Sequence, residues 1–97
     1  MTKSIMFLRH AAARGHPLAL YNLGIAHIEG RGVPIDLQKA AALLQRSAVA
    51  GVSLAMINLA LLYRDGRGVP QDTTIAREWL TAAAPFEPAA TQLLKEL

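Results

Sequence analysis

The amino-acid sequence predicts an all-α fold of about six short helices arranged in a right-handed stack. Three observations lead to this prediction. The chain of 97 residues repeats itself after 36 positions, which is typical of helical repeat proteins. It is 53% hydrophobic but only 5% aromatic, and it is rich in alanine, the residue with the highest helix propensity. No segment alternates between apolar and polar residues as a half-buried strand does.

The repeat is evident when residues 15–48 are compared with residues 51–84, which share 14 identities in 34 positions. Both segments contain a Gly-Arg-Gly-Val-Pro-x-Asp motif, which begins at Gly30 in one and at Gly66 in the other. We therefore divide a single domain over residues 1–97 into a half-repeat 3–14, a repeat 15–50, a repeat 51–86 and a half-repeat 87–97.

Each repeat is predicted to contain two helices. The half-repeat 3–14 corresponds to a second helix, because Leu8 and Ala12 lie 36 residues before a leucine and an alanine of the next one. The first helix of repeat 15–50 is apolar on nearly every side, including Leu18, and ends at Gly30, which adopts the left-handed cap conformation without strain. Asp36 follows the turn as the N-cap of the second helix.

The second repeat follows the same scheme, with Gly66 and Asp72 at the equivalent helix ends. In the half-repeat 87–97, Ala89 and Leu93 match the first helix of repeat 51–86 at a shift of 34, so the connection before it is two residues shorter. The side chains that recur on the inward stripe are expected to be buried: Ala19, Leu23, Leu44, Ala48, Ala55, Leu59, Leu80 and Ala84.

The motifs resemble those of the Sel-like repeat family, a relative of the tetratricopeptide repeat. Its signature of spaced Ala, Gly and Leu residues is similar to the run from Ala12 through Gly15 and Ala19 to Gly24, and its glycine turn to the run from Gly30 to Asp36. The second copy departs from the signature with Val52 in place of histidine and Ala60 in place of glycine. The resemblance covers nearly the whole chain.

This resemblance implies an αα-solenoid whose first helices line a concave face, and a non-catalytic adaptor or scaffold that binds a peptide, loop or helix of a partner protein there. Two asparagines recur on that face; each amide either binds the backbone of an extended peptide or ties neighbouring helices together. The expected partner-binding residues are Tyr21, Asn22, Ile25, Ile28, Glu29, Ile57, Asn58, Leu61, Arg64 and Asp65, with Thr91 from the last half-repeat.

Two other interpretations stay open. The apolar residues 5–8 and the C-terminal leucines would allow self-assembly through the terminal helices, as a homodimer or by helix exchange, because end repeats normally carry a polar outer face. Alternatively, the chain is a fragment of a longer array, since two complete repeats are fewer than the three or so that usually stabilise a solenoid.

Other classes of function are not supported by the sequence. The chain contains no cysteine, and His10, His16 and His27 fit no zinc-binding spacing; His16 and His27 are expected to be structural. The glycine turns follow helices and end in Val-Pro, unlike phosphate-binding loops. The sequence therefore predicts no enzyme activity, metal or cofactor.

The partner is predicted to be neither a nucleic acid nor a membrane. The net charge is only +3 and the basic residues are spread along the chain, whereas nucleic-acid-binding proteins cluster them. No apolar run is long enough to span a bilayer, and Arg9, His10 and Arg14 interrupt the N-terminal segment before a signal-peptide core could form. We expect a cytoplasmic protein.

Overall fold

The computed structural model describes the chain from Thr2 to Leu97, with side chains from Ile5 onward. It contains six α-helices, and no strand occurs in this part of the chain, so the predicted all-α repeat fold is confirmed. The helices are α1 (Thr2–Ala13), α2 (Pro17–Glu29), α3 (Leu37–Val49), α4 (Ser53–Asp65), α5 (Thr73–Ala83) and α6 (Pro88–Glu96).

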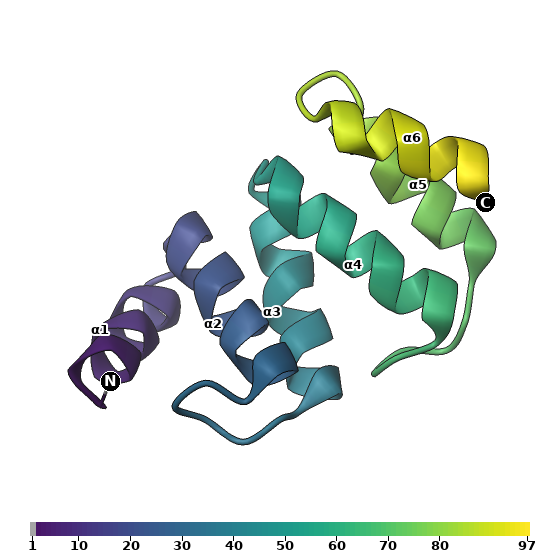
Figure 1. Cartoon of the computed structure of the whole chain (residues 1–97). Helices are drawn as coiled ribbons and strands as arrows, with labels where there is room; N and C mark the ends of the chain where they lie inside the picture. The colour runs from purple at the N-terminus through teal and green to yellow at the C-terminus, as the bar shows by residue number, and fades with distance from the viewer. Residues whose placement is uncertain (1) are drawn as a thin grey trace.

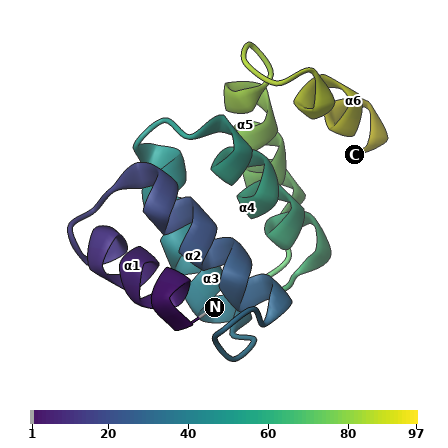
Figure 2. The same cartoon turned by 60° about the vertical axis from the view of Figure 1, so that its left-hand side comes forward.

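The helices pack as pairs that follow one another along an elongated molecule of 40 × 24 × 18 Å. The first helix of each repeat packs on its second helix, α2 on α3 and α4 on α5, and α3 also packs on α4 of the next repeat. Figure 1 shows α4 in front of part of α3, and α6 in front of part of α5, with the two chain ends far apart. Turned by 60°, the molecule shows α1 beside α2 at the N-terminal end (Figure 2).

The turns within the two repeats have the same backbone conformation, as the motif predicts. Gly30 (φ 74°, ψ 34°) and Gly66 (φ 68°, ψ 39°) are left-handed C-caps, and their N–H groups donate to the carbonyls of Ala26 and Leu62. The side chains of Asp36 and Asp72 each accept a hydrogen bond of 3.0 Å from the backbone N–H three residues later. The first glycine and the aspartate of each motif therefore end one helix and begin the next at a fixed distance.

The core lies between successive helices rather than at one centre. Leu44, Leu59 and Leu80 are 1% exposed or less, and all but one of the side chains expected on the inward stripe are buried. The exception is Ala84, which is half-buried because it is the C-cap of α5, at the point where this helix ends. The prediction that the first helix is buried nearly all round is also wrong at Leu18, which is 57% exposed.

The last helix has a different register from the one expected. Ala90 is fully buried and Ala89 is exposed, and α6 begins 35 residues after α4. Ala90 and Leu94 therefore take the places that the shift of 34 gave to Ala89 and Leu93, and the connection is one residue shorter, not two. This register leaves Thr91 in the position of Met56, outside the expected row of binding residues.

Candidate functional site

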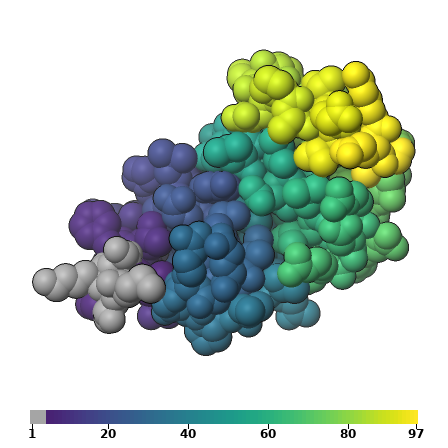
Figure 3. All heavy atoms as spheres, viewed as in Figure 1, coloured from purple at the N-terminus to yellow at the C-terminus, as the bar shows by residue number. Residues whose placement is uncertain are grey.

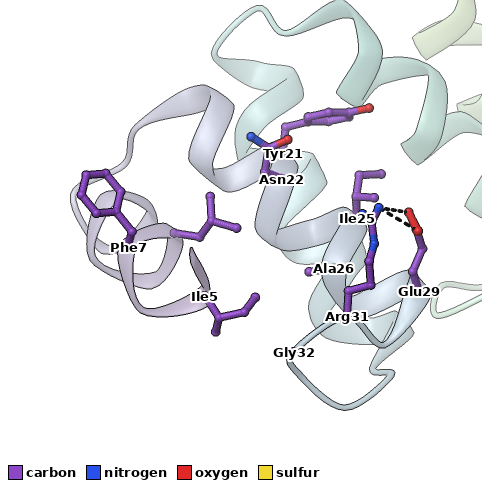
Figure 4. Close-up of a pocket in the computed structure, with 10 residues that line it drawn as sticks. Ile5, Phe7, Tyr21, Asn22, Ile25, Ala26, Glu29, Arg31 and Gly32 are labelled. Carbon is purple, nitrogen blue, oxygen red and sulfur yellow. Dashed lines mark hydrogen bonds and ion pairs between the residues drawn. The ribbon is translucent and has the colours of Figure 1, made fainter. Parts of the chain in front are cut away.

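A groove of about 820 Å³ lies between α1 and α2 at the N-terminal end of the molecule (Figure 4). We call it the α1–α2 groove. Its walls are mostly apolar side chains of the two helices, and its polar groups come from α2 and the turn that follows it. The groove is lined by Ile5, Phe7, Leu8, Tyr21, Asn22, Ile25, Ala26, Glu29, Arg31 and Gly32.

The turn after α2 closes the lower end of the groove because it packs directly on α1. Ile5 is buried together with Ala26 and Val33. A Cβ atom on Gly32 would lie 2.5 Å from Cγ1 of Ile5, so only a glycine allows this close approach. The repeated glycine of the turn therefore positions the groove as well as shaping the loop.

The polar groups of the groove carry little net charge. Arg31 donates to the carboxylate of Glu29 at 2.8 Å, and both side chains are largely exposed. Figure 4 shows this pair beside Ile25, with Asn22 one turn of α2 further from the glycine turn. Because the charged pair is neutral as a unit, the groove suits an apolar surface that has polar edges.

The structure brings four of the expected partner-binding residues together in this groove: Tyr21, Asn22, Ile25 and Glu29. On their other side, Tyr21 and Ile25 are packed with Ile28 against the core formed by α3 and α4. Ile28 is half-buried in that contact and does not line the groove. The apolar residues of α2 therefore join one repeat to the next as well as facing outward.

The equivalent residues of α4 lie outside the α1–α2 groove, and one of them is not accessible. Ile57 is only 8% exposed and packs with Ala60, Ala76 and Leu80, so its assignment to an open binding face is wrong. Leu61 is half-buried against the same cluster. The amide of Asn58 donates to the carbonyl of Leu54 at 2.9 Å, within its own helix, so it does not tie neighbouring helices together.

Arg64 and Asp65 form a two-point ion pair at the end of α4, with distances of 2.9 and 3.0 Å. The hydrogen bonds from Arg64 lower the pKa of Asp65, and those to Asp65 raise the pKa of Arg64. Asp65 takes the place of Glu29 in the repeat, but its partner Arg64 takes the place of Ile28, and the counterpart of Arg31 is Arg67. In both complete repeats the first helix thus ends in an acid that is paired with an arginine beside the glycine cap.

The family of the chain follows from comparison with known proteins. A family model described as Sel1 repeat matches residues 17–52 and again residues 53–84. The chain belongs to the Sel1 repeat family. A crystal structure of a Sel1 repeat protein from Oxalobacter formigenes superposes with a TM-score of 0.95 and 42% sequence identity over 98% of this chain. No curated protein matches the chain significantly.

A second similar structure is c5321, described as a protective antigen present in uropathogenic Escherichia coli strains and displaying an SLR fold. It has a TM-score of 0.84 and 33% identity over 87% of this chain. The chain spans only 28% of the Oxalobacter protein and 18% of c5321. Most of each relative therefore lies outside the region that it shares with this chain.

The two histidines of the first Sel1 repeat have structural roles. His27 is 4% exposed, and its Nδ1 lies 3.0 Å from the carbonyl oxygen of Pro34, which holds the glycine turn against α2. His16 acts through its backbone as the N-cap of α2, and its side chain makes no capping bond. Among the described residues, no three His, Asp or Glu side chains lie close enough to hold a metal ion.

Within the same part of the chain, no helix has both the length and the apolar character needed to cross a membrane.

Six residues that line the groove were not expected from the sequence: Ile5, Phe7, Leu8, Ala26, Arg31 and Gly32. The apolar residues of α1 were interpreted only as a possible assembly surface. The repeat itself contains the missing signal, since Phe7 lies 36 residues before Leu43 and so takes the position of a core leucine. In the structure Leu43 is 8% exposed, whereas Phe7 is 78% exposed.

Proposed function

We propose that the chain is a non-catalytic protein-interaction module that binds a peptide, loop or helix of a partner protein along its first-helix face. By this face we mean the accessible side of α2 and α4, much of which is seen with α6 in Figure 3. Sel1 repeats generally mediate protein interactions. The proposal extends this property of the family to a particular surface of this chain.

The observation that carries the proposal is the α1–α2 groove, because four of its lining residues are among those that the family resemblance implies for binding. A concave, mostly apolar site with a few polar groups is the usual form of a recognition site. From the groove the proposed face continues over Asn58, Leu61, Arg64 and Asp65 of α4. Ile57 is left out because it is buried.

Paired amide variants test the proposed face. Asn22 is exposed and Asn58 half-exposed at equivalent positions of α2 and α4, whereas Gln38 and Gln45 are exposed on α3. We compare an Asn22→Lys/Asn58→Lys variant with a Gln38→Lys/Gln45→Lys variant, each used as bait for affinity capture and quantitative mass spectrometry. The asparagine variant should lose captured proteins about tenfold or more, and the glutamine variant should keep them.

The matched variants make the result specific, since both add two positive charges to helix surfaces. If the glutamine variant loses the captured proteins while the asparagine variant retains them, the binding surface lies on the second helices and the proposal is wrong. Equal capture by both variants and the wild type would also contradict it. Circular dichroism melting of each variant shows whether a loss arises from unfolding.

Self-association through α1 is a second candidate function, and one observation favours it. Met6 is 54% exposed and Phe7 is 78% exposed on this terminal helix. The C-terminal end gives it no support, because Leu94 and Leu97 pack inward against the core of α5. Sedimentation velocity at two protein concentrations separates a monomer from an assembly through α1.

A further inference from the structure

Three exposed arginines lie around the turn that joins α1 to α2. Arg9 is near the end of α1, Arg14 is in the turn itself, and Arg46 is in the last turn of α3. We call these three residues the arginine patch. Nη2 of Arg46 would lie 4.0 Å from a Cβ atom on Gly15, the residue that follows Arg14. The end of α3 therefore places its arginine directly beside the turn.

Packing on α2 brings Arg9 and Arg46 to the same surface. Ala12 of α1 and Leu43 of α3 are buried in one cluster with residues of α2. Arg9 precedes Ala12 by three residues and Arg46 follows Leu43 by three, so each arginine neighbours this shared contact on its own helix. The hydroxyl of Ser47 donates to a carbonyl oxygen at the start of α2 at 2.8 Å, which fixes the end of α3 there.

The carboxylates of the first repeat lie at the opposite ends of its helices. Residues 1–49 contain six of the ten lysines and arginines but only two of the seven acids, Glu29 and Asp36. Glu29 ends α2 and is paired with Arg31, and Asp36 caps the start of α3. A helix of 13 residues is about 20 Å long, so both acids are far from the turn. Among the described residues, no acid forms an ion pair with the arginine patch.

The next repeat shows that the fold does not require these arginines. A basic side chain at the C-terminal end of a helix also stabilises the helix through its dipole. In the next repeat, however, alanines take the places of Arg14 and Arg46, and a glutamine takes the place of Arg9. The last turn of α5 contains no basic residue at all. The positive charge of the first repeat is therefore available for recognition.

The outer side of the second helices stays open where these helices have neighbours on both sides. A shallow hollow of about 280 Å³ on α1 is lined by Met6, Arg9, His10 and Ala13. The four equivalent residues of α3 are all exposed, although α3 packs against both α2 and α4. A further repeat before α1 would therefore leave the arginine patch and the hollow accessible.

The chemistry of this surface fits a short acidic segment of a protein. Guanidinium groups bind carboxylates through pairs of parallel hydrogen bonds. Surfaces that bind single-stranded nucleic acids usually add aromatic side chains on which bases stack, and the arginine patch contains none. Electrostatic attachment to membranes uses about four to eight clustered basic residues, more than the three found here. The hollow adds an apolar contact, because Met6 is 54% exposed beside Arg9.

We propose that the arginine patch binds an acidic segment of a partner protein, with an apolar side chain of that segment in the hollow beside Arg9. This site is separate from the first-helix face and does not depend on it. The Gln38→Lys/Gln45→Lys variant adds positive charge to α3, so it does not remove this contact.

A fluorescent peptide with the sequence Glu-Glu-Leu-Glu-Glu is the direct probe, and fluorescence anisotropy at low salt measures its binding to the 97-residue protein. We expect saturable binding that weakens about tenfold or more in Arg9→Gln/Arg46→Gln. The matched control Arg67→Gln/Arg77→Gln removes the same charge from two exposed arginines outside the patch, and it should bind within about twofold of the wild type. Circular dichroism melting verifies that both variants are folded.

Two further peptides test the details of recognition. A peptide with glutamines in place of the glutamates should lose saturable binding, because it has no carboxylates for the arginines. A peptide with asparagine in place of leucine should bind about threefold or more weakly, because it has no apolar side chain for the hollow. Affinity for the original peptide should fall as salt screens the charges.

Equal losses in the two double variants would show attraction to the net charge alone and would overturn the proposal, as would the absence of saturable binding. Undiminished binding of the asparagine peptide would overturn the role of the hollow. A single-stranded DNA oligonucleotide that binds more tightly than the peptide, and that Arg9→Gln/Arg46→Gln weakens, would assign the patch to a nucleic acid instead. Dimers that the same variant dissolves would assign it to the acids of a second copy. Either result would overturn the proposal.

Discussion

At the scale of single residues, positions 36 apart have the same side chain wherever the backbone of the turn requires it. Asp36 and Asp72 cap their helices with hydrogen bonds of equal length, and Gly30 and Gly66 have nearly equal dihedral angles. Where packing alone decides, the residue can vary, as with Gly24 and Ala60, although the buried leucines of the two repeats are identical. The turn residues therefore define the repeat more strictly than the helices do.

Gly68 gives the sharpest test of this requirement. Its φ is +74°, and an added Cβ atom would overlap the backbone carbonyl of Leu37, at the start of α3. Gly51 also has a positive φ, of +100°, but no atom lies within 4 Å of its added Cβ. We expect Gly68→Ala to lower the free energy of unfolding by about 1–3 kcal/mol more than Gly51→Ala. Urea unfolding of the two variants measures this difference, and equal losses would show that the loop does not press on α3.

The ion pair on α4 predicts a specific change in the titration of Asp65. Removing the hydrogen bonds in Arg64→Ala should raise the pKa of Asp65 toward its ordinary value. Because the folded pKa of Asp65 is the lower one, the pair stabilises the fold above the unfolded pKa, and this contribution is lost as the pH falls through the folded pKa. The contribution is small because both side chains are exposed to solvent.

NMR titration of the Asp65 carboxyl in Arg64→Ala measures the change. Arg67→Ala is the matched control, because Arg67 lowers the pKa of Asp65 only through its charge and more weakly than Arg64 does. A larger shift in the control than in Arg64→Ala would contradict the assigned cause.

At the scale of the helix, each first helix has two environments. Leu59 of α4 is 1% exposed and packs with Leu44 in the core, whereas Leu54, the second residue of the same helix, is 45% exposed. The same division holds in α2, where Leu23 is buried and Leu18 is exposed. Hydrophobic side chains therefore occur on the open side of the first helices as well as in the core.

This division predicts unequal effects of two identical substitutions on α4. Leu59→Ala should lower the free energy of unfolding by about 2–5 kcal/mol, because it removes contacts and leaves a cavity. Leu54→Ala should cost less than about 1 kcal/mol, because its side chain is partly in water already. Chemical unfolding measures both values; similar losses would mean that the core stripe of α4 has been misplaced.

At the scale of the whole molecule, the two ends differ. The C-terminal end is closed by α6, whose leucines turn inward and whose polar residues face solvent. The N-terminal end presents the exposed phenylalanine of α1 and the α1–α2 groove. The two ends of the described chain therefore expose different surfaces.

The polar end predicts the effect of removing α6. A chain that stops at residue 87 should expose the side of α5 that Ala90 and Leu94 cover, including Leu80 and Ala83. We expect its melting temperature to fall by about 10 °C or more, on the scale of 4–8 °C for each kcal/mol in a domain of this size. Calorimetry gives the shift and gel filtration detects self-association; a monomer with unchanged melting would show that α6 does not cap the stack.

The fold could be predicted from the sequence because its determinants are local. The Gly-Arg-Gly-Val-Pro-x-Asp motif fixes a helix end and the next helix start within seven residues, through a left-handed glycine and a capping carboxylate. Two copies of it at a fixed spacing establish the period, and the inward leucines follow from the period. The binding residues expected on α2 and α4 came instead from the resemblance to the Sel-like repeat family, and four of them line the α1–α2 groove.

Only the tertiary structure decided the register of α6, the burial of Ile57 and the exposure of Phe7. Residues 89–90 are both alanine and 93–94 both leucine, so two registers fit the same pattern, and packing against α5 selects one. Ile57 is buried because α5 and α6 cover it, and Phe7 is exposed because no first helix covers it among the described residues. Periodicity indicates which side chains share a face of a helix, but whether that face meets another helix or solvent depends on the neighbours that the fold places against it.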